Sequence, residues 1–274
     1  MGRILNELEA LGHAEDTLTV MHSDHVSYSF GLLCTSSDLA RQLRAGASVN
    51  TATGKSSRCA QQNIIGVSLV TDVNNYVQNW ELGARVPLII RAPWLKPSVG
   101  ARTTVLAELV DIFPTVSDLS GLPLPHGEKL DGVSLAPVLR NPGDRHIATT
   151  LKPHALSQYM RCPPPTANAS MYWKSNACLM TDRTLFPFMG YSIRTAEWRY
   201  TEWVRWNGTS LAPIWTERVG HELYSHVGDD GTDFDAFENT NEVATADPEV
   251  VTALSSLLHA VVANQTRLPS LAVR

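Results

Sequence analysis

Two adjacent residues of the chain, Asp24 and His25, carry side chains suited to metal chemistry. They follow a short, β-rich apolar segment, residues 17–21, which predicts a strand that ends in a polar cluster. Ligand sites in open α/β sheets lie outside the carboxyl ends of the strands, and a carboxylate and a neutral imidazole both bind divalent cations well. The pattern is compatible with a metal site at Asp24 and His25. Composition alone favours the commoner alternative, a solvated loop with a hydrogen-bonded aspartate.

The elements that would hold this strand in place are predicted from the spacing of apolar residues. A first helix is expected over residues 4–11, with Gly12 as its C-cap. Residues 85–91 have the pattern of a buried strand. Residues 105–119 predict a helix that Pro114 must kink or restart. The apolar stripe of that helix would consist of Leu106, Leu109, Val110 and Phe113.

The C-terminal part of the chain changes to a two-residue period, which is typical of strands. Residues 190–195 and 198–205 alternate in this way, and residues 222–224 predict a further strand. Residues 248–263 predict a closing amphipathic helix. Aromatic side chains of the second strand are expected on one face, packed in a core: Trp198, Tyr200 and Trp203.

Six blocks of sequence, in this order, resemble the sulfatase family of the alkaline phosphatase superfamily. They are Ser23-Asp24-His25, Asn79-Trp-Glu-Leu-Gly-Ala-Arg-Val-Pro-Leu-Ile-Ile, Val110-Asp-Ile-Phe-Pro-Thr-Val, Leu130-Asp-Gly-Val-Ser-Leu, Met189-Gly-Tyr-Ser-Ile-Arg-Thr with Trp198-Arg-Tyr-Thr, and Glu222-Leu-Tyr with Glu238-Asn-Thr-Asn. The resemblance covers the chain except for about residues 26–75. Within the family, residues 190–195 are most similar to the branch that acts on iduronate 2-sulfate.

The resemblance implies a specific chemistry. Members of this family hydrolyse sulfate esters with a formylglycine made from the cysteine of a Cys-x-Pro-x-Arg motif, and an Asp-His pair after a core strand helps to bind calcium. Carried onto this chain, the metal ligands would be Asp24 and His25, with calcium as the cofactor and magnesium as the alternative. The implied substrate is a sulfated sugar or glycosaminoglycan, and the implied setting is lysosomal or secreted. The missing N-terminal half of the fold would be a partner.

The chain also departs from the family pattern. None of its four cysteines (Cys34, Cys59, Cys162 and Cys178) is followed by x-Pro-x-Arg. Tyr76 stands where the family has a lysine that contacts the substrate sulfate, and a phenol supplies no permanent positive charge. We therefore expect an inactive fragment. Two other interpretations stay open: a non-catalytic pseudoenzyme or wrongly assembled gene product, and a phosphatase or phosphodiesterase of the same superfamily.

The expected fold is α/β. Residues 1–155 would be the second half of an alkaline-phosphatase-like sulfatase domain, in which residues 26–75 are an atypical insertion or replacement. Residues 156–274 would be a small α+β domain with an antiparallel sheet. Segments 141–145 and 163–165, which contain proline, are expected to be linkers.

Composition excludes several classes of function. The net charge of −5 argues against nucleic-acid binding, and no run of 18 apolar residues predicts a membrane-spanning helix. The first residues do not have the pattern of a signal peptide. Glycosylation sequons begin at Asn168, Asn207 and Asn264, and cysteine spacing leaves disulfide pairing open. Aspartates in the segment 229–235 lack the spacing of a calcium loop and predict a solvated acidic turn.

Overall fold

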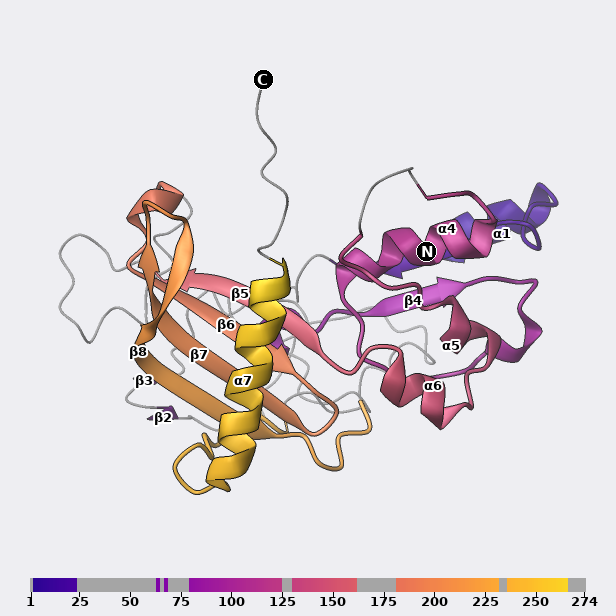
Figure 1. The fold of residues 1–274 in the computed structure, drawn as a ribbon. Coiled ribbons are helices and arrows are strands. Elements are labelled where there is room, and N and C mark those ends of the chain that lie inside the picture. The colour runs from indigo at the N-terminus through magenta and orange to yellow at the C-terminus, as the bar shows by residue number, and fades with distance from the viewer. Residues whose placement is uncertain are drawn as a thin grey trace, which may run out of the picture.

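The computed structural model describes residues 2–23, 79–124, 130–161, 181–231 and 236–265, and the backbone of two residue pairs, 63–64 and 67–68. These residues form two regions: a four-stranded sheet covered by a long helix, and a group of shorter elements around a two-stranded sheet (Figure 1). Helices and antiparallel sheets are mixed, which is consistent with the predicted α/β class.

The larger sheet is antiparallel throughout, and its strands follow one another in chain order, β5-β6-β7-β8. Side chains of successive residues in a strand point to opposite faces, so each strand contributes to two environments. One face is apolar and the other carries charged groups. The strands are β5 (Ala155–Arg161), β6 (Phe188–Arg194), β7 (Trp198–Asn207) and β8 (Ala212–Ser225).

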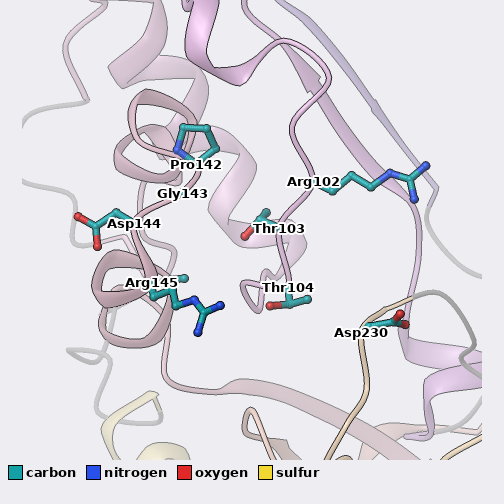
Figure 2. A pocket seen from close by; sticks show the side chains of 9 residues that line it. Arg102, Thr103, Thr104, Pro142, Gly143, Asp144, Arg145 and Asp230 are labelled. Carbon is teal, nitrogen blue, oxygen red and sulfur yellow. The ribbon is translucent and has the colours of Figure 1, made fainter.

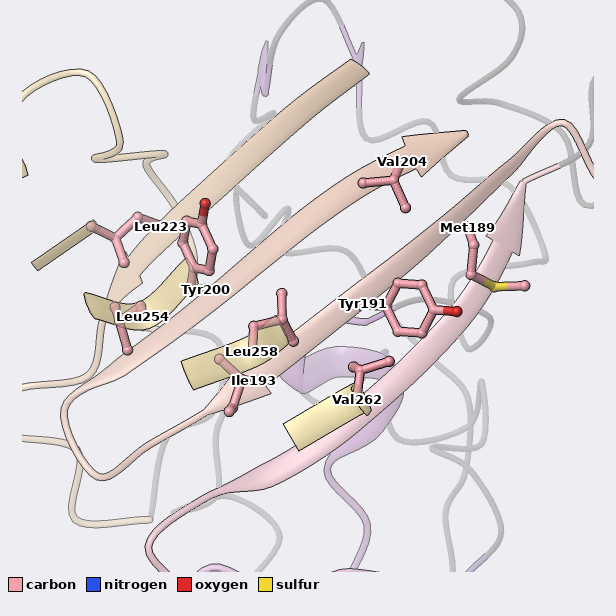
Figure 3. Packing of buried hydrophobic residues seen from close by; sticks show 9 residues of the cluster. All are labelled: Met189, Tyr191, Ile193, Tyr200, Val204, Leu223, Leu254, Leu258 and Val262. Carbon is pink, nitrogen blue, oxygen red and sulfur yellow. The ribbon is translucent and has the colours of Figure 1, made fainter. Parts of the chain in front are cut away.

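The apolar face of the sheet packs against α7 (Pro248–Gln265). Leu254, Leu258 and Val262 recur every four residues and therefore form one stripe of this helix. Figure 3 shows this stripe gathered with Tyr191, Ile193 and other residues of the strands. Full burial of one such side chain stabilises the fold by about 1.5–3 kcal/mol, so this cluster is the principal core of the described residues.

The opposite face of the same sheet explains one incorrect expectation. Trp198 and Tyr200 do pack in the core with α7, as predicted. Trp203 does not, because it lies an odd number of residues away and so points to the other face. There its indole Nε1 donates to a carboxylate oxygen of Glu222 at 3.0 Å.

The second region surrounds β1 (Thr19–His22) and β4 (Leu88–Arg91), which pair antiparallel. A small core joins Ala92, Leu119 and Ala136 to residues of these strands. The helices are α1 (Gly2–Ala10), α3 (Glu81–Ala84), α4 (Ile112–Ser120), α5 (Ala136–Arg140) and α6 (Arg145–Thr150). The remaining elements are the 3₁₀ turns η1 (Lys96–Ser98), η2 (Leu109–Asp111) and η5 (Arg183–Leu185), and the short strands β2 (Asn63–Ile64) and β3 (Val67–Ser68).

Most predicted elements are confirmed. The first helix is α1, and Gly12 follows it at a φ of 78°, a left-handed conformation that glycine adopts without strain. Two elements were missed. β5 lies just before the proline run at 163–165, and α6 begins in the predicted linker, where the Asp144 side chain accepts bonds from two backbone N–H groups of its first turn.

The predicted helix over 105–119 is wrong at its start. α4 begins only at Ile112, so Pro114 is its third residue and lies in the first turn, where no intrahelical N–H bond is lost. The predicted stripe therefore falls mostly outside the helix. Leu109, Val110 and Phe113 are exposed, whereas Thr115 and Leu119 are buried.

No helix among the described residues combines the length and hydropathy that crossing a membrane requires.

Candidate functional site

The strand that should lead into the metal site is β1, and it ends at His22. His22 pairs with Leu88 of β4 in antiparallel register, so the carboxyl end of β1 lies at the amino end of β4, just beyond α3. Asp24 and His25 lie outside the described residues, as do Tyr76 and the four cysteines. The metal site was expected at the end of β1 because ligands of open α/β sheets bind in a crevice outside the carboxyl ends of the strands. β1 and β4 pair antiparallel instead, so this reason does not apply to them.

The charged face of the large sheet holds α3 through Glu81. One oxygen of this carboxylate lies 2.6 Å from Arg199 and 3.0 Å from Arg194, and the other lies 3.3 Å from Arg85. Burial by itself would raise the pKa of Glu81. The three guanidinium groups outweigh it and hold this pKa at about 2.

A second set of acids completes this network from the segment after β8. Glu238 accepts from the Glu81 backbone N–H at 2.6 Å and pairs with Arg199. Asp229 pairs with Arg194 at 3.2 Å and lies 3.0 Å from Nδ1 of His226. The side chain of Asp229 is only 4% exposed, so the prediction of a solvated acidic turn is wrong at this residue. Asp233 and Asp235 lie outside the described residues.

Beside this network lies Glu222, a buried carboxyl group surrounded by neutral donors. It accepts from the indole of Trp80 at 2.7 Å, from that of Trp203 at 3.0 Å and from the Tyr224 hydroxyl at 3.1 Å. Burial raises the pKa of Glu222, and these three hydrogen bonds oppose the rise. Because Trp80 directly precedes α3, this contact is a further attachment of α3 to the sheet.

Three residues of the network have the ligand types of a metal site. Glu81, His226 and Glu238 each place one ligand atom within 4.8 Å of the others. Their carboxylates, however, already receive the guanidinium groups of Arg194 and Arg199. A divalent cation would have to displace these positive charges or lie beside them, so this group does not fit a metal ion. It fits a buried ion-pair network.

The network as a whole fixes the end of the segment that leads into α3. It joins α3 to β6, to β7 and to the loop after β8, which are far apart in sequence. Sequence analysis missed it, although most of its residues lie in the blocks that carry the family resemblance. Those residues are Glu81, Arg85, Arg194, Arg199 and Glu238, whereas His226 and Asp229 lie outside the blocks. The signal was the presence of charged residues in strand patterns that otherwise predict burial.

Comparison with known proteins gives several similar sequences. No protein-family model matches the chain. It is 33% identical to the steryl-sulfatase of Mus musculus over 175 residues, which cover 64% of this chain and 23% of that protein. It is 29% identical to arylsulfatase K of Rattus norvegicus over 185 residues, which cover 67% of this chain and 25% of that protein. Iduronate 2-sulfatase of Mus musculus is 27% identical over 181 residues, which cover 53% of this chain and 32% of that protein.

A solved structure is also similar, although distantly. It is the crystal structure of a sulfatase candidate from Bacteroides thetaiotaomicron, with a TM-score of 0.48 and 18% identity over 96% of this chain and 39% of that one.

The similar sequences agree with the family that the six blocks indicated. Each of the three carries the name of a sulfatase, although steroid, aryl and iduronate sulfates differ as substrates. This chain spans about a quarter of the length of the first two. The matches do not single out iduronate 2-sulfatase as the nearest relative. They do confirm the resemblance that the sequence blocks indicated: the chain is similar to sulfatases, over a C-terminal portion of their sequences.

Proposed function

We propose that the chain is part of a sulfuric ester hydrolase. The observation that carries this proposal is the similarity to three differently named sulfatases over 53–67% of the chain. This chain spans about a quarter of the length of the steryl-sulfatase and of arylsulfatase K. The proposed activity would therefore belong to a whole enzyme of which this chain supplies a portion. The finer proposal is a glycosaminoglycan-type substrate such as iduronate 2-sulfate, supported by the resemblance of residues 190–195.

The metal site of the proposed enzyme would include Asp24 and His25, with calcium as the ion. When bound, such an ion neutralises the charge of a sulfate ester and stabilises developing oxyanions. The contribution of this chain would be to present the two ligands at the end of β1. The network around Glu81 would fix α3, which directly precedes β4, the partner strand of β1.

The proposed division of the chain at residue 155 coincides with the start of β5 at Ala155. The partner of the first part would be the N-terminal half of a sulfatase fold. Exposed apolar side chains support this, because ten of the thirteen large ones among the described residues precede residue 125, including Ile89, Val110 and Phe113. A lysosomal or secreted setting agrees with the exposed sequon at Asn207.

A second interpretation is a non-catalytic product. It is favoured by the absence of Cys-x-Pro-x-Arg and by Tyr76 at the lysine position. We therefore expect the purified chain to show no turnover of an aryl sulfate above buffer, because no side chain is available to form the covalent intermediate. The measurement is release of the phenol at high protein concentration. Turnover that Asp24→Ala abolishes would contradict this expectation, whereas turnover that survives it would indicate contamination.

Calcium binding tests the metal proposal without requiring activity. With only Asp24 and His25 as protein ligands, most of the six to eight oxygen positions around calcium would be filled by water. We expect calorimetry to give a dissociation constant near millimolar or weaker. Asp24→Asn or His25→Ala should abolish this binding. Glu217→Gln, which changes an exposed carboxylate of β8 outside the network around Glu81, serves as the control and should leave calcium binding unchanged. Micromolar binding would show that further ligands come from this chain, and binding that survives both substitutions would place the ion elsewhere.

A further inference from the structure

A cavity of about 210 Å³ shares no lining residue with the network around Glu81, although its Asp230 directly follows Asp229 of that network. Its walls are the loop at residues 102–104, the turn at 142–145 that opens α6, and the loop after β8 at Asp230. Figure 2 shows the Arg145 side chain pointing toward Thr104, with Asp230 on the far side. The cavity is therefore bounded by polar side chains from three separate segments.

The positive charges of this cavity come from Arg102 and Arg145, both of which are exposed. Within the part of the chain that the structure describes, neither of them forms an ion pair, whereas other arginines do: Arg85, Arg91, Arg140 and Arg194. Asp144, the nearest acid in sequence, accepts from two backbone N–H groups of α6, at 2.9 and 3.1 Å. Its carboxylate is thus already engaged, and it points away from Thr103 and Thr104 in Figure 2.

The polar groups indicate the chemistry of a ligand. A guanidinium group presents a fork of N–H donors that matches the oxygens of a sulfate or carboxylate. The hydroxyl groups of Thr103 and Thr104 can donate to or accept from a ligand. A ligand with one anionic group and several hydroxyl groups matches both the guanidinium and the hydroxyl groups, whereas a bare anion has no hydroxyl groups to offer.

We propose that this cavity binds one anionic sugar residue of a sulfated polysaccharide. The anionic group would contact Arg145, with Arg102 at the rim, and the sugar hydroxyls would contact Thr103 and Thr104. Pockets for drug-sized ligands occupy about 300–1,000 Å³, so this smaller cavity suits a single sugar ring. The inference rests on the proposed function for the substrate class, but it needs no catalytic group.

The test is calorimetric titration of the full chain with three hexasaccharides: one sulfated, one with uronate carboxylates but no sulfate, and one neutral. We expect the sulfated or the uronate sugar to bind and the neutral one not to bind, and the stronger of the first two identifies the anionic group. Arg145→Gln and Arg102→Gln should each weaken that binding about tenfold, the effect of losing a charge-assisted hydrogen bond.

The matched control is Arg183→Gln, which removes one exposed arginine in η5, outside the cavity. It changes the net charge by the same amount, so a general attraction of polyanions would weaken equally in all three variants. We expect less than a twofold effect from the control. Equal losses in the three variants, no loss in the two cavity variants, or equal binding of the neutral sugar would each overturn the inference. Calcium binding should be unchanged by the cavity variants, so failure here is distinguishable from failure of the proposed function.

Discussion

Replacement of Arg199 by alanine is expected to lower the free energy of unfolding by about 3–5 kcal/mol, the range for removing one partner of a buried ion pair. Arg199 is only 3% exposed and contacts both Glu81 and Glu238. Without it, these two carboxylates would remain buried with fewer positive charges beside them. The loss would exceed the value of the pair itself, because the desolvation of the remaining charges is no longer compensated.

The measurement is equilibrium unfolding in urea, followed by tryptophan fluorescence. The matched control is Arg205→Ala in the same strand. The Arg205–Glu217 pair is 3.9 Å long and more than half exposed, so its loss should cost about 0–1 kcal/mol. Similar effects for the two substitutions would show that the network around Glu81 does not stabilise the fold.

The same network predicts that the free energy of unfolding depends on pH in the acidic range. The pKa of Glu81 is lowered from 4.5 to about 2, so its contribution is fully present above pH 4.5 and is lost as the pH falls toward 2. In Arg199→Ala this pKa should move upward toward 4.5, so the acid-induced loss should be smaller and should be complete at a higher pH. Unfolding midpoints between pH 2 and pH 6 would check this, and parallel curves for the two proteins would contradict it.

Gly190→Ala is expected to be nearly as damaging, with a loss of about 3 kcal/mol, at the upper end of the usual cost of overpacking. A Cβ at this residue would lie 2.4 Å from the ring of Trp203 and 2.7 Å from the side-chain nitrogen of Asn79. Trp203 cannot move away freely, since it is 2% exposed and hydrogen-bonded to Glu222. The added methyl group must therefore displace either the indole or the segment that leads into α3.

Gly220→Ala is the matched control for this substitution. Gly190 and Gly220 both pair with Trp203, from the two strands that flank β7. A Cβ at Gly220 would meet the same ring at 4.0 Å, an ordinary contact, and should change stability by less than about 1 kcal/mol. Thermal unfolding would compare the two. If Gly190→Ala were equally mild, the ring of Trp203 would have to be more mobile than its burial indicates.

The sequence alone determined the elements whose signal is local. The alternation around β6 and β7 and the period of α7 were visible because side-chain direction follows directly from backbone geometry. The position of Gly12 after α1 was predictable for the same reason. The family was also recognisable, because short blocks in a fixed order survive where overall identity is low. The family resemblance also indicated Asp24 and His25 as metal ligands, and this role stays a prediction.

The tertiary structure decided what each face of an element contacts. Leu109, Val110 and Phe113 form an apolar pattern, yet they are exposed, because α4 begins only at Ile112 and packs its other face, with Thr115 and Leu119, against the rest of the fold. Asp229 lies in a run of acids that predicted solvation, yet it is buried, because Arg194 reaches it from β6. Neither fact is encoded near the residue itself. A charge can be buried only if a partner of opposite charge is brought to it from elsewhere in the chain, and only the folded arrangement of the strands supplies that partner.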